Sequence, residues 1–322
     1  MSVRLSVCMP THNYGTYIGR AIESLLADVP PGIEILVLDG GSSDRTREVV
    51  ENLAKGRRFL RYVYQSERGG IDRDLAQAVE LASGEYCWLL SADDALAPGA
   101  LPRILQEFEN GSDLLLTNRI WCDVNLNLIS RQTWLAGPEE DQLFDFSDDR
   151  QISDYLDRAS SLGALFSFMS VIGFRRESWL RTKSNPALVA SNYAHVERLF
   201  SIARNGTRLK YIAAPLVLCR SGNDSFRASG LASRLAIDLR GYLRLSQAIF
   251  PDNEQLQKAF RAVVRREHSW RVWMHAREIT RDPARWLEVE QLLPAYGFRW
   301  MQVLGIKALG LASRLRTRKP AA

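Results

Sequence analysis

Two adjacent carboxylates stand directly after an apolar run in this sequence. Residues 86–90 are Tyr-Cys-Trp-Leu-Leu, and after Ser91 and Ala92 come Asp93 and Asp94. Such a run predicts a strand buried on both faces, where an unpaired ionised carboxylate would be very costly. We therefore expect both acids at the exit of the strand, where two clustered carboxylates can hold a hard divalent cation.

Polar residues also follow two other predicted strands. Residues 10–13, Pro-Thr-His-Asn, come after the alternating stretch 5–9, and Asp39 closes the apolar stretch 33–38. Because the carboxyl ends of parallel strands converge on one edge of a sheet, these residues and the acidic pair outline a single crevice. The sequence has neither the Gly-x-Gly-x-x-Gly loop nor the Walker loop, which argues against a dehydrogenase or a P-loop enzyme. A nucleotide held without a glycine-rich phosphate loop needs a metal, which the acidic pair can bind.

The elements that must position these residues alternate regularly over the first 120 residues. Short apolar runs are separated by amphipathic segments, which is typical of βαβ units forming a parallel sheet. The predicted strands are 5–9, 33–38, 60–64, 86–90 and 114–117. The pattern weakens over 118–162, where a hairpin near 123–129 is one interpretation. Residues 211–219 predict another strand, interrupted by Pro215, and after Ser229 the periodicity is helical.

Size and composition indicate an ordinary globular protein. With 322 residues the chain exceeds one average domain, so we expect one large domain and a smaller extension. Hydrophobic residues make up 46% and charged residues 25%, which argues against a disordered, collagenous or coiled-coil chain. Residues 251–322 hold 14 Lys or Arg against 7 Asp or Glu, whereas the first 250 hold 28 against 30. The net charge of +5 therefore belongs to the C-terminal segment.

The N-terminus and the cysteines lead us to expect a cytoplasmic protein. The strand pattern begins at Val3, which leaves no room for a signal peptide, and no apolar stretch reaches the roughly 20 residues that span a bilayer. The four cysteines are far apart in the sequence: Cys8, Cys87, Cys122 and Cys219. Two of them lie in predicted buried strands, so we expect reduced core thiols rather than a zinc cluster or a disulfide framework.

Four motifs in register carry a resemblance to a known family. They are residues 9–13 (Met-Pro-Thr-His-Asn), 38–44 (Leu-Asp-Gly-Gly-Ser-Ser-Asp), 82–86 (Ala-Ser-Gly-Glu-Tyr) and 91–94 (Ser-Ala-Asp-Asp). In order and spacing they resemble the nucleotide-binding half of the second family of inverting glycosyltransferases, which have the GT-A fold. Residues 70–74 and 220–225 are similar to the abequosyltransferase-like members, which build bacterial surface polysaccharide.

The resemblance implies an α/β fold of the GT-A type, with a Rossmann-like, mainly parallel sheet flanked by helices. It implies a glycosyltransferase domain at 1–228, with a nucleotide-binding half at 1–120 and an acceptor half at 121–228, followed by a basic helical region at 229–322. The implied activity moves one sugar, with inversion, from a nucleotide diphosphate sugar to a glycan or polyprenyl-linked glycan. The implied cofactor is Mg or Mn, and nucleic acid is not a partner.

The resemblance also assigns the donor site. Thr11 and Asp39 would contact the base or ribose of the nucleotide sugar. Asp93 would face the ribose and is a second metal candidate, while Asp94 would bind Mg or Mn against the diphosphate. A bound cation offsets the charge that the departing nucleoside diphosphate gains. The other nucleotide-sugar candidates lie in or beside the matching motifs: Pro10, Asn13, Arg68, Asp72, Arg73 and Arg220.

Two positions depart from the family pattern. Many relatives carry two acids at the end of the second strand, whereas here the second position is Gly40, which leaves the donor nucleotide open. Ser91 replaces the first acid of the Asp-x-Asp motif, so only the acidic pair is left for metal. The processive signature Gln-x-x-Arg-Trp is absent, which suggests one sugar per event. For Arg68 and Arg73, ordinary solvated side chains are an equal alternative.

The catalytic base has three candidates. An inverting transfer needs a group within hydrogen-bond reach of the acceptor hydroxyl. Relatives commonly place an acid near the start of a helix in the second half, where residues 191–197 of this sequence are Ser-Asn-Tyr-Ala-His-Val-Glu. Asn192 cannot be a base. His195, with an ordinary pKa of about 6.5, is the first candidate, Glu197 and Asp224 are the others, and a His on a helix surface is the structural alternative.

The C-terminal segment suggests contact with the inner face of the cell membrane. One helical face would carry apolar residues followed by basic ones: Met301, Leu304, Ala308, Leu311 and Leu315, then Arg314, Arg316, Arg318 and Lys319. This pattern suits a helix lying on an anionic bilayer, and packing on the catalytic domain is the alternative. The rival function, favoured by Gly40 and Ser91, is a catalytically inactive nucleotide-sugar-binding or membrane scaffolding protein. A nucleotidyltransferase is a third option.

Overall fold

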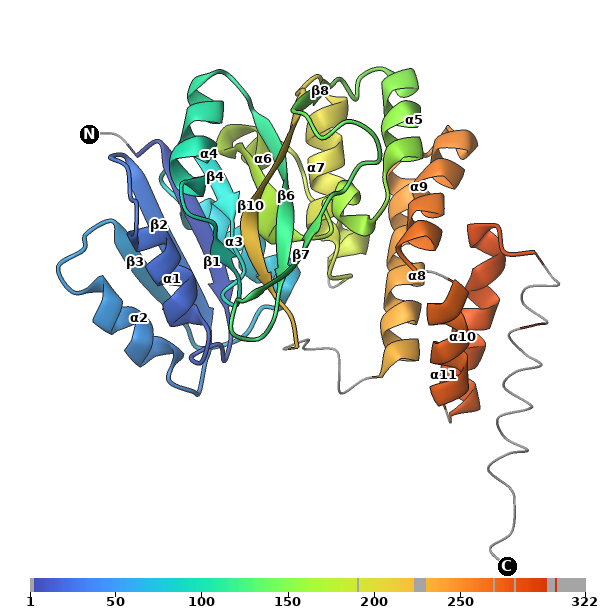
Figure 1. Ribbon diagram of the computed structural model, residues 1–322, viewed down its shortest axis with the longest axis horizontal. Coiled ribbons are helices and arrows are strands. Elements are labelled where there is room, and N and C mark those ends of the chain that lie inside the picture. The colour runs from blue at the N-terminus through green and yellow to red at the C-terminus, as the bar shows by residue number, and fades with distance from the viewer. Residues whose placement is uncertain are drawn as a thin grey trace, which may run out of the picture.

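A mixed β-sheet forms the centre of the computed structural model, which describes residues 3–189, 191–222, 230–268, 270–280, 282–299 and 305 (Figure 1). The strand order is β3-β2-β1-β4-β9-β6-β10-β5, with β7 paired to β6 and β8 paired to β10. The strands are β1 (Leu5–Thr11), β2 (Ile33–Gly40), β3 (Leu60–Gln65), β4 (Tyr86–Leu89), β5 (Ala95–Leu96), β6 (Leu114–Cys122), β7 (Leu128–Gln132), β8 (Gln142–Phe144), β9 (Ile172–Arg175) and β10 (Leu209–Arg220).

The first four predicted strands form a parallel sheet, as expected. The chain runs outward from β1 to β2 and β3 and then returns to β4 on the other side of β1, all in parallel register. Right-handed crossovers therefore place α1 (Ile18–Leu26) and α2 (Thr46–Ala54) on one face and α3 (Ile71–Leu81) on the other. The strand order reverses at β1, which makes the carboxyl ends of β1, β2 and β4 the expected ligand crevice.

The apolar run that precedes the acidic pair is a buried strand. All four residues of β4 are buried, and so is the following residue, Leu90. The chain then leaves the sheet, so both acids lie at the strand exit, as predicted. All four cysteines are free and buried.

The second half of the sheet differs more from expectation. β9 was not predicted; it lies antiparallel between β4 and β6. Its Gly173 permits this packing, because a Cβ there would stand 2.7 Å from Cε3 of Trp88. The hairpin expected near 123–129 is formed by β6 and β7. The strand expected at 211–219 is the longer β10, whose pairing with β6 shifts register on both sides of Pro215.

Helices cover the second half of the sheet and extend beyond it. They are α4 (Ala100–Glu109), α5 (Asp149–Arg158), α6 (Arg176–Arg181), α7 (Ala194–Arg204), α8 (Leu231–Ile249), α9 (Glu254–Glu267), α10 (Trp270–Ile279) and α11 (Pro283–Leu292). α7 begins at Ala194, and Pro186–Leu188 forms a separate 3-10 turn before it.

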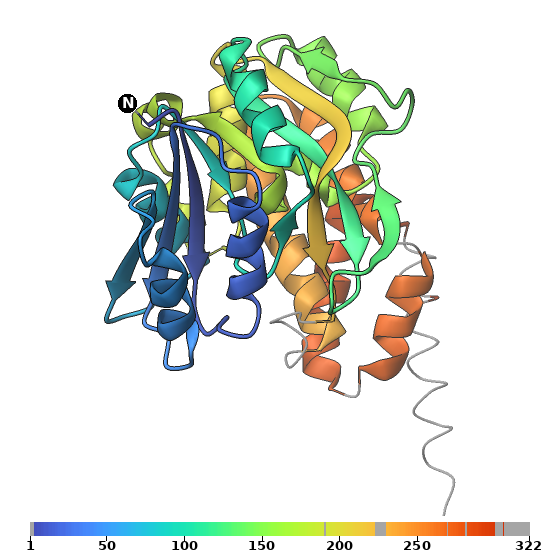
Figure 2. The ribbon, with the colours of Figure 1, turned by 60° about the vertical axis from the view of Figure 1, so that its left-hand side comes forward.

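The C-terminal helices pack against the sheet-bearing part of the chain (Figures 1 and 2). α8 contacts α7, and α9 contacts α5. Aromatic side chains join the two parts, since the ring of Phe200 on α7 lies 5.4 Å from that of Phe260 on α9, edge to face. The boundary expected near residue 228 stays a prediction. Within the described residues, no helix combines the length and hydropathy needed to cross a membrane. The apolar and basic face expected at 301–319 lies outside those residues.

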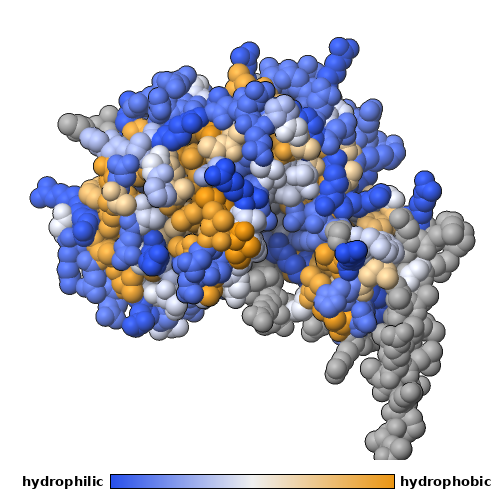
Figure 3. All heavy atoms as spheres, in the orientation of Figure 1, coloured by the Kyte–Doolittle hydropathy of each residue, from blue (hydrophilic) through white to orange (hydrophobic). Residues whose placement is uncertain are grey.

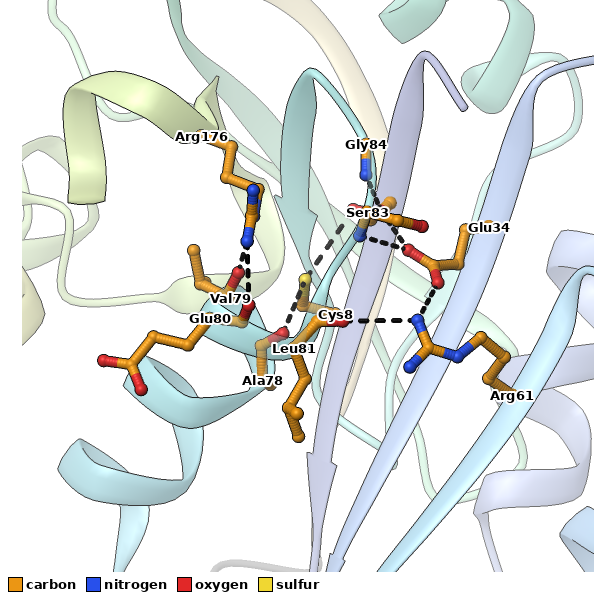
Figure 4. Close-up of polar contacts among 11 residues, drawn as sticks. Cys8, Glu34, Arg61, Ala78, Val79, Glu80, Leu81, Ser83, Gly84 and Arg176 are labelled. Atoms are coloured by element: carbon orange, nitrogen blue, oxygen red, sulfur yellow. Dashed lines mark hydrogen bonds and ion pairs between the residues drawn. The ribbon is translucent and has the colours of Figure 1, made fainter. Parts of the chain in front are cut away.

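A buried polar network fixes the edge of the sheet opposite the acidic pair (Figure 4). The carboxylate of Glu34, near the start of β2, accepts hydrogen bonds from the Ser6 hydroxyl, the Arg61 guanidinium and the Ser83 N–H, the last at 2.8 Å. The Gly84 N–H donates to the Ser6 hydroxyl at 2.8 Å, and a Cβ on Gly84 would stand 2.6 Å from the Ser6 nitrogen. The 82–86 motif therefore anchors the entry into β4 and lies away from the crevice.

Candidate active site

Loops after β1 and β2 meet at the carboxyl edge of the sheet, the lower edge in Figure 2. Thr11 ends β1 and is 5% exposed, and its hydroxyl is buried with no hydrogen-bond partner among the described residues. Asn13 has a left-handed backbone, with φ of 59°, and its N–H donates to the Ser42 hydroxyl at 2.7 Å. The Asn13 side-chain oxygen accepts from the Ser43 N–H at 2.8 Å. Asn13 therefore joins the two loops, while the Thr11 hydroxyl has capacity for a ligand.

Asp39 lies fully buried at the end of β2. Its Oδ1 accepts from the Ser42 N–H at 2.8 Å and its Oδ2 accepts from the Tyr62 hydroxyl at 2.6 Å. Burial, together with the Asp39 carboxylate, raises the pKa of Tyr62, so Tyr62 stays a hydrogen-bond donor. The carboxylate of Asp39 is therefore held in one orientation beside Thr11, its partner in the register of β1 and β2.

Gly40, at the end of β2, leaves room for a carboxylate from helix α3. A Cβ at position 40 would lie 3.0 Å from Oδ2 of Asp74, a buried residue on α3. Oδ1 of Asp74 accepts from the Gly69 N–H at 3.0 Å. At position 40 many relatives carry an acid, whereas this chain has glycine. The structure puts the carboxylate of Asp74, which was not a candidate, against that position.

The two acids of the acidic pair have different surroundings. Asp94 is 2% exposed; its Oδ2 accepts from the Ser170 hydroxyl at 2.6 Å and its Oδ1 accepts from the Arg220 N–H at 3.1 Å. Asp93 is half-buried and accepts from the Ser91 hydroxyl. Burial, and then the neighbouring Asp93 carboxylate, raise the pKa of Asp94 to about 7. Asp94 thus ties β4 to two distant segments, and Asp93 is the more accessible carboxylate.

Arg220 secures the acidic pair from the end of β10. Its Nε donates to the Asp93 carbonyl oxygen at 2.8 Å, and its guanidinium lies 4.8 Å from the centre of the Tyr17 ring. It also donates to the Val124 carbonyl oxygen. Arg220, predicted to bind the nucleotide sugar, is 7% exposed, and these contacts hold the turn in place.

The two predicted phosphate-binding arginines are exposed. Arg68 lies in the loop before α3, and Arg73 lies in the first turn of that helix. Burial, and then Asp93 and Asp94, raise the pKa of Tyr14 to about 12, while Arg68 lowers it. Arg68 and the acidic pair therefore act on the same side chain, which places the charge of Arg68 near the crevice.

His195, the first candidate for the base, is buried at the start of α7. Its Nε2 lies 3.0 Å from the Phe166 carbonyl oxygen, so Nε2 carries the proton in the neutral ring and Nδ1 is the basic atom. Nδ1 has no hydrogen-bond partner in the described part of the chain. Burial lowers the pKa of His195, and the nearby carboxylate of Asp72 acts in the opposite direction.

His195 lines a cavity of about 410 Å³ between α3, α6 and α7. The other residues that line it include Asp72, Arg73, Ala76, Trp179 and Arg198. Asp72, predicted to bind the nucleotide sugar, accepts hydrogen bonds from the N–H groups of Asn192 and Ala194, at 2.9 and 3.1 Å.

The other two base candidates differ from His195. Glu197 is not among the residues that line the cavity, and its Oε1 accepts from the Ser201 hydroxyl at 3.1 Å. Burial raises the pKa of Glu197, which favours its neutral form. Asp224 lies outside the described residues.

One short segment joins the base candidate to the acidic pair. Phe166 accepts from His195, and four residues later Ser170 donates to Asp94. Four residues span at most about 14 Å, so the two contact points are close. No group of three or more His, Cys, Asp or Glu suited to a metal occurs in the described ranges.

Comparisons with known proteins agree with this architecture. The sequence model of the family described as glycosyl transferase family 2 matches residues 6–177. The abequosyltransferase RfbV of Salmonella typhimurium is 32% identical over 272 residues, which cover 83% of this chain and 81% of that protein.

Solved structures show the same fold. Staphylococcus aureus TarS 1-349, in complex with UDP-GlcNAc, has a TM-score of 0.64 at 15% identity and covers 96% of this chain and 89% of its own. The mannosyltransferase PcManGT of Pyrobaculum calidifontis, in complex with GDP-Man and Mn²⁺, has a TM-score of 0.53 at 17% identity and covers 98% and 81%. The fold is thus of the GT-A type, and the chain belongs to glycosyl transferase family 2.

Proposed function

We propose that this glycosyltransferase transfers one sugar, with inversion and with a divalent metal, from a nucleoside diphosphate sugar to a hydroxyl of a glycan or lipid-linked glycan. The observation that carries the proposal is the link between the acidic pair and His195 through residues 166–170. In this proposal the segment connects the leaving-group site, at the acidic pair, with the proton acceptor, His195. Similarity to an abequosyltransferase supports surface polysaccharide as the product.

The donor nucleotide is assigned to the crevice between β1, β2 and β4. The unpartnered Thr11 hydroxyl and the fixed Asp39 carboxylate offer a donor and acceptors to the base or ribose. Pro10 and Asn13 shape the loop around them, and we assign Arg68, whose charge acts near the acidic pair, to the diphosphate. Asp74, packed under Gly40, adds a carboxylate to the same wall.

The residues present suit a metal that is shared with the substrate. Mg²⁺ and Mn²⁺ take oxygen ligands, and Mg²⁺ is commonly held by one or two carboxylates completed by substrate phosphates. Asp93 is the more accessible acid, and we propose it as the first ligand, with Asp94 holding the turn and remaining the second candidate. When bound, the cation offsets the charge that develops on the departing diphosphate.

His195 is assigned as the base and the neighbouring cavity as the acceptor site. The acceptor oxygen attacks the anomeric carbon from the face opposite the diphosphate, and its proton passes to Nδ1 of His195 as the bond to the diphosphate breaks. Because Nε2 is bound to Phe166, the ring presents Nδ1 in its basic form. A cavity of about 410 Å³ lies within the usual range for ligand sites.

Metal-dependent release of nucleoside diphosphate tests the proposed reaction. A panel of nucleotide sugars is screened by thermal shift with and without Mn²⁺, and the best donor is then incubated with a glycan acceptor. Transfer with release of nucleoside diphosphate supports the proposal. Binding without release under all conditions points to the inactive nucleotide-sugar-binding protein, and pyrophosphate exchange points to a nucleotidyltransferase.

We also propose that the C-terminal helices contact the inner face of the cell membrane. Trp270, Ile279 and Leu287 on α10 and α11 are 40%, 50% and 51% exposed, and Figure 3 shows hydrophobic residues gathered over this end of the molecule. The segment from 251 is also basic, which suits an anionic bilayer. Removing residues from Phe298 onward, or replacing the three exposed residues by Ser, should weaken binding to anionic vesicles. Unchanged binding in both variants would contradict the proposal.

A further inference from the structure

The start of α7 is held partly by a carboxylate from another helix. Tyr193, at the N-cap position, makes no side-chain cap hydrogen bond. The N–H groups of Asn192 and Ala194 instead both donate to the carboxylate of Asp72 on α3. Asn192 adopts a left-handed backbone, with φ of 69°, beside this contact. An unusual local backbone and a carboxylate from another helix are thus combined at this helix start.

Asp72 serves two helix starts at once. It lies in the first turn of α3, and it accepts the otherwise unpaired N–H groups at the start of α7. The N-terminal ends of helices carry partial positive charge, so an ionised carboxylate is favoured at both. A neutral side chain of the same shape would lose this electrostatic part of the contact.

The opposite side of the same turn is held by α8. The Tyr193 hydroxyl donates to Asp238, a buried residue of α8, and Arg234 donates to the Tyr193 oxygen at 3.1 Å. Gly241 of α8 makes room for the tyrosine, because a Cβ there would lie 2.8 Å from Cδ2 of Tyr193. Residues 192–194 are therefore clamped from two helices, directly before His195.

We infer that Asp72 is a positioning residue, which holds the start of α7 so that His195 faces the acceptor. The inference rests on the proposed role of His195 as the base. Phe166 fixes the ring, and Asp72 fixes the backbone that carries it. Asp72 also places a negative charge near the ring, where Arg73 of α3 and Arg198 of α7 line the same cavity.

The charge of Asp72 gives the inference a signature in the pH profile. A nearby carboxylate stabilises the imidazolium that forms when His195 takes the proton, and so raises the pKa of His195. Without it the pKa of His195 falls, and the acid limb of the kcat profile moves to lower pH. A loss of structure alone would lower kcat at every pH and leave the limb in place.

The test compares Asp72→Asn with two other variants. Asp72→Asn should lower kcat about 100-fold, the scale of a small misplacement of a reacting group, and shift the acid limb to lower pH while the donor KM is kept. Asp72→Glu, which retains the charge, should keep the acid limb near its original pH. Glu48→Gln removes the same charge from an exposed position in the first turn of another helix, α2, and should leave the profile unchanged.

Three outcomes would overturn the inference. The first is a uniform loss of kcat in Asp72→Asn with the acid limb in place. The second is a raised donor KM with kcat kept, which would make Asp72 a nucleotide contact instead. The third is full activity in His195→Asn, which would remove the base assignment itself. If His195→Asn is inactive but Asp72→Asn keeps the acid limb of the kcat profile at its original pH, the positioning role is overturned and the proposed function is kept.

Discussion

The acidic pair offers the sharpest test of how the site is built, because its two carboxylates have different partners. Asp94 is buried and accepts from Ser170 and from the Arg220 N–H. In Asp94→Asn one acceptor oxygen becomes an NH₂ group, so one buried hydrogen bond is lost. Leaving a buried donor unsatisfied costs about 1–3 kcal/mol. Asp93→Asn changes a half-buried residue and should cost less than about 1 kcal/mol.

These free energies convert into measurable shifts of the melting temperature. Unfolding entropy is about 2.1 cal/mol/K per residue, so over 322 residues each kcal/mol corresponds to about 1.5 °C. Asp94→Asn should therefore melt about 1.5 to 4.5 °C below the parent in the absence of ligand. A donor with Mn²⁺ at 100 times its Kd stabilises the parent by about 2.7 kcal/mol, or about 4 °C.

The assay is thermal unfolding with and without Mn²⁺ and donor. Asp93→Asn should nearly keep the ligand-free melting temperature and lose the metal-dependent shift. Asp94→Asn should melt at a lower temperature without ligand and keep the metal-dependent shift. Asp148→Asn is the matched control: it belongs to another adjacent acid pair, but its side chain caps α5, a role that Asn also fills. If Asp94→Asn loses the metal-dependent shift at an unchanged ligand-free melting temperature, our assignment of the pair is wrong.

Three further changes test other parts of the molecule. His195→Asn should lower kcat at least about 100-fold with donor binding kept, and in the parent the acid limb of kcat should lie below pH 6.5, because burial lowers the pKa of this base. Ala76→Trp should fill the cavity and abolish transfer while donor hydrolysis continues, whereas Gln77→Trp, on the exposed side of α3, should do neither. Glu34→Gln should cost about 1–3 kcal/mol without changing kcat. Burial raises the pKa of Glu34, but hydrogen bonds from Ser6 and Ser83 lower it below 4.5, so the parent should lose this stability as pH falls below 4.5 and the variant should not. Denaturant unfolding at pH 3 to 7 checks the last point.

The first half of the fold was predictable because buried parallel strands leave a continuous apolar signal. β1 and β2 are buried at every residue, and the run 86–90 stops where the chain leaves the sheet. Asp39 and Asp93 were identifiable because each follows directly after an apolar run, although Asp39 is itself fully buried and is held there by hydrogen bonds from Ser42 and Tyr62.

The second half was less predictable because its elements depend on distant partners. β9 is four residues long, and its place between β4 and β6 depends on Gly173 fitting over Trp88, 85 positions earlier. Asp74 was missed because only the absence of a side chain at Gly40 gives its carboxylate a place in the crevice wall. A periodicity argument treats Asp74 as an ordinary polar residue of α3.

The segment 166–170 shows why the sequence indicated residues on the donor side of the site more clearly than residues on the acceptor side. Phe166 contributes a backbone carbonyl, and Ser170 contributes a small hydroxyl buried in an aromatic region, so neither residue type signals chemistry by itself. Yet an inverting displacement needs its base and its leaving group on opposite faces of one carbon, and a link of about 14 Å at most limits how far apart they can lie. Phe166 has a left-handed backbone, with φ of 59°, so its carbonyl can face His195 while the chain continues towards Asp94. In the proposed mechanism this segment holds the base and the leaving-group site in place, although its own residues touch no substrate.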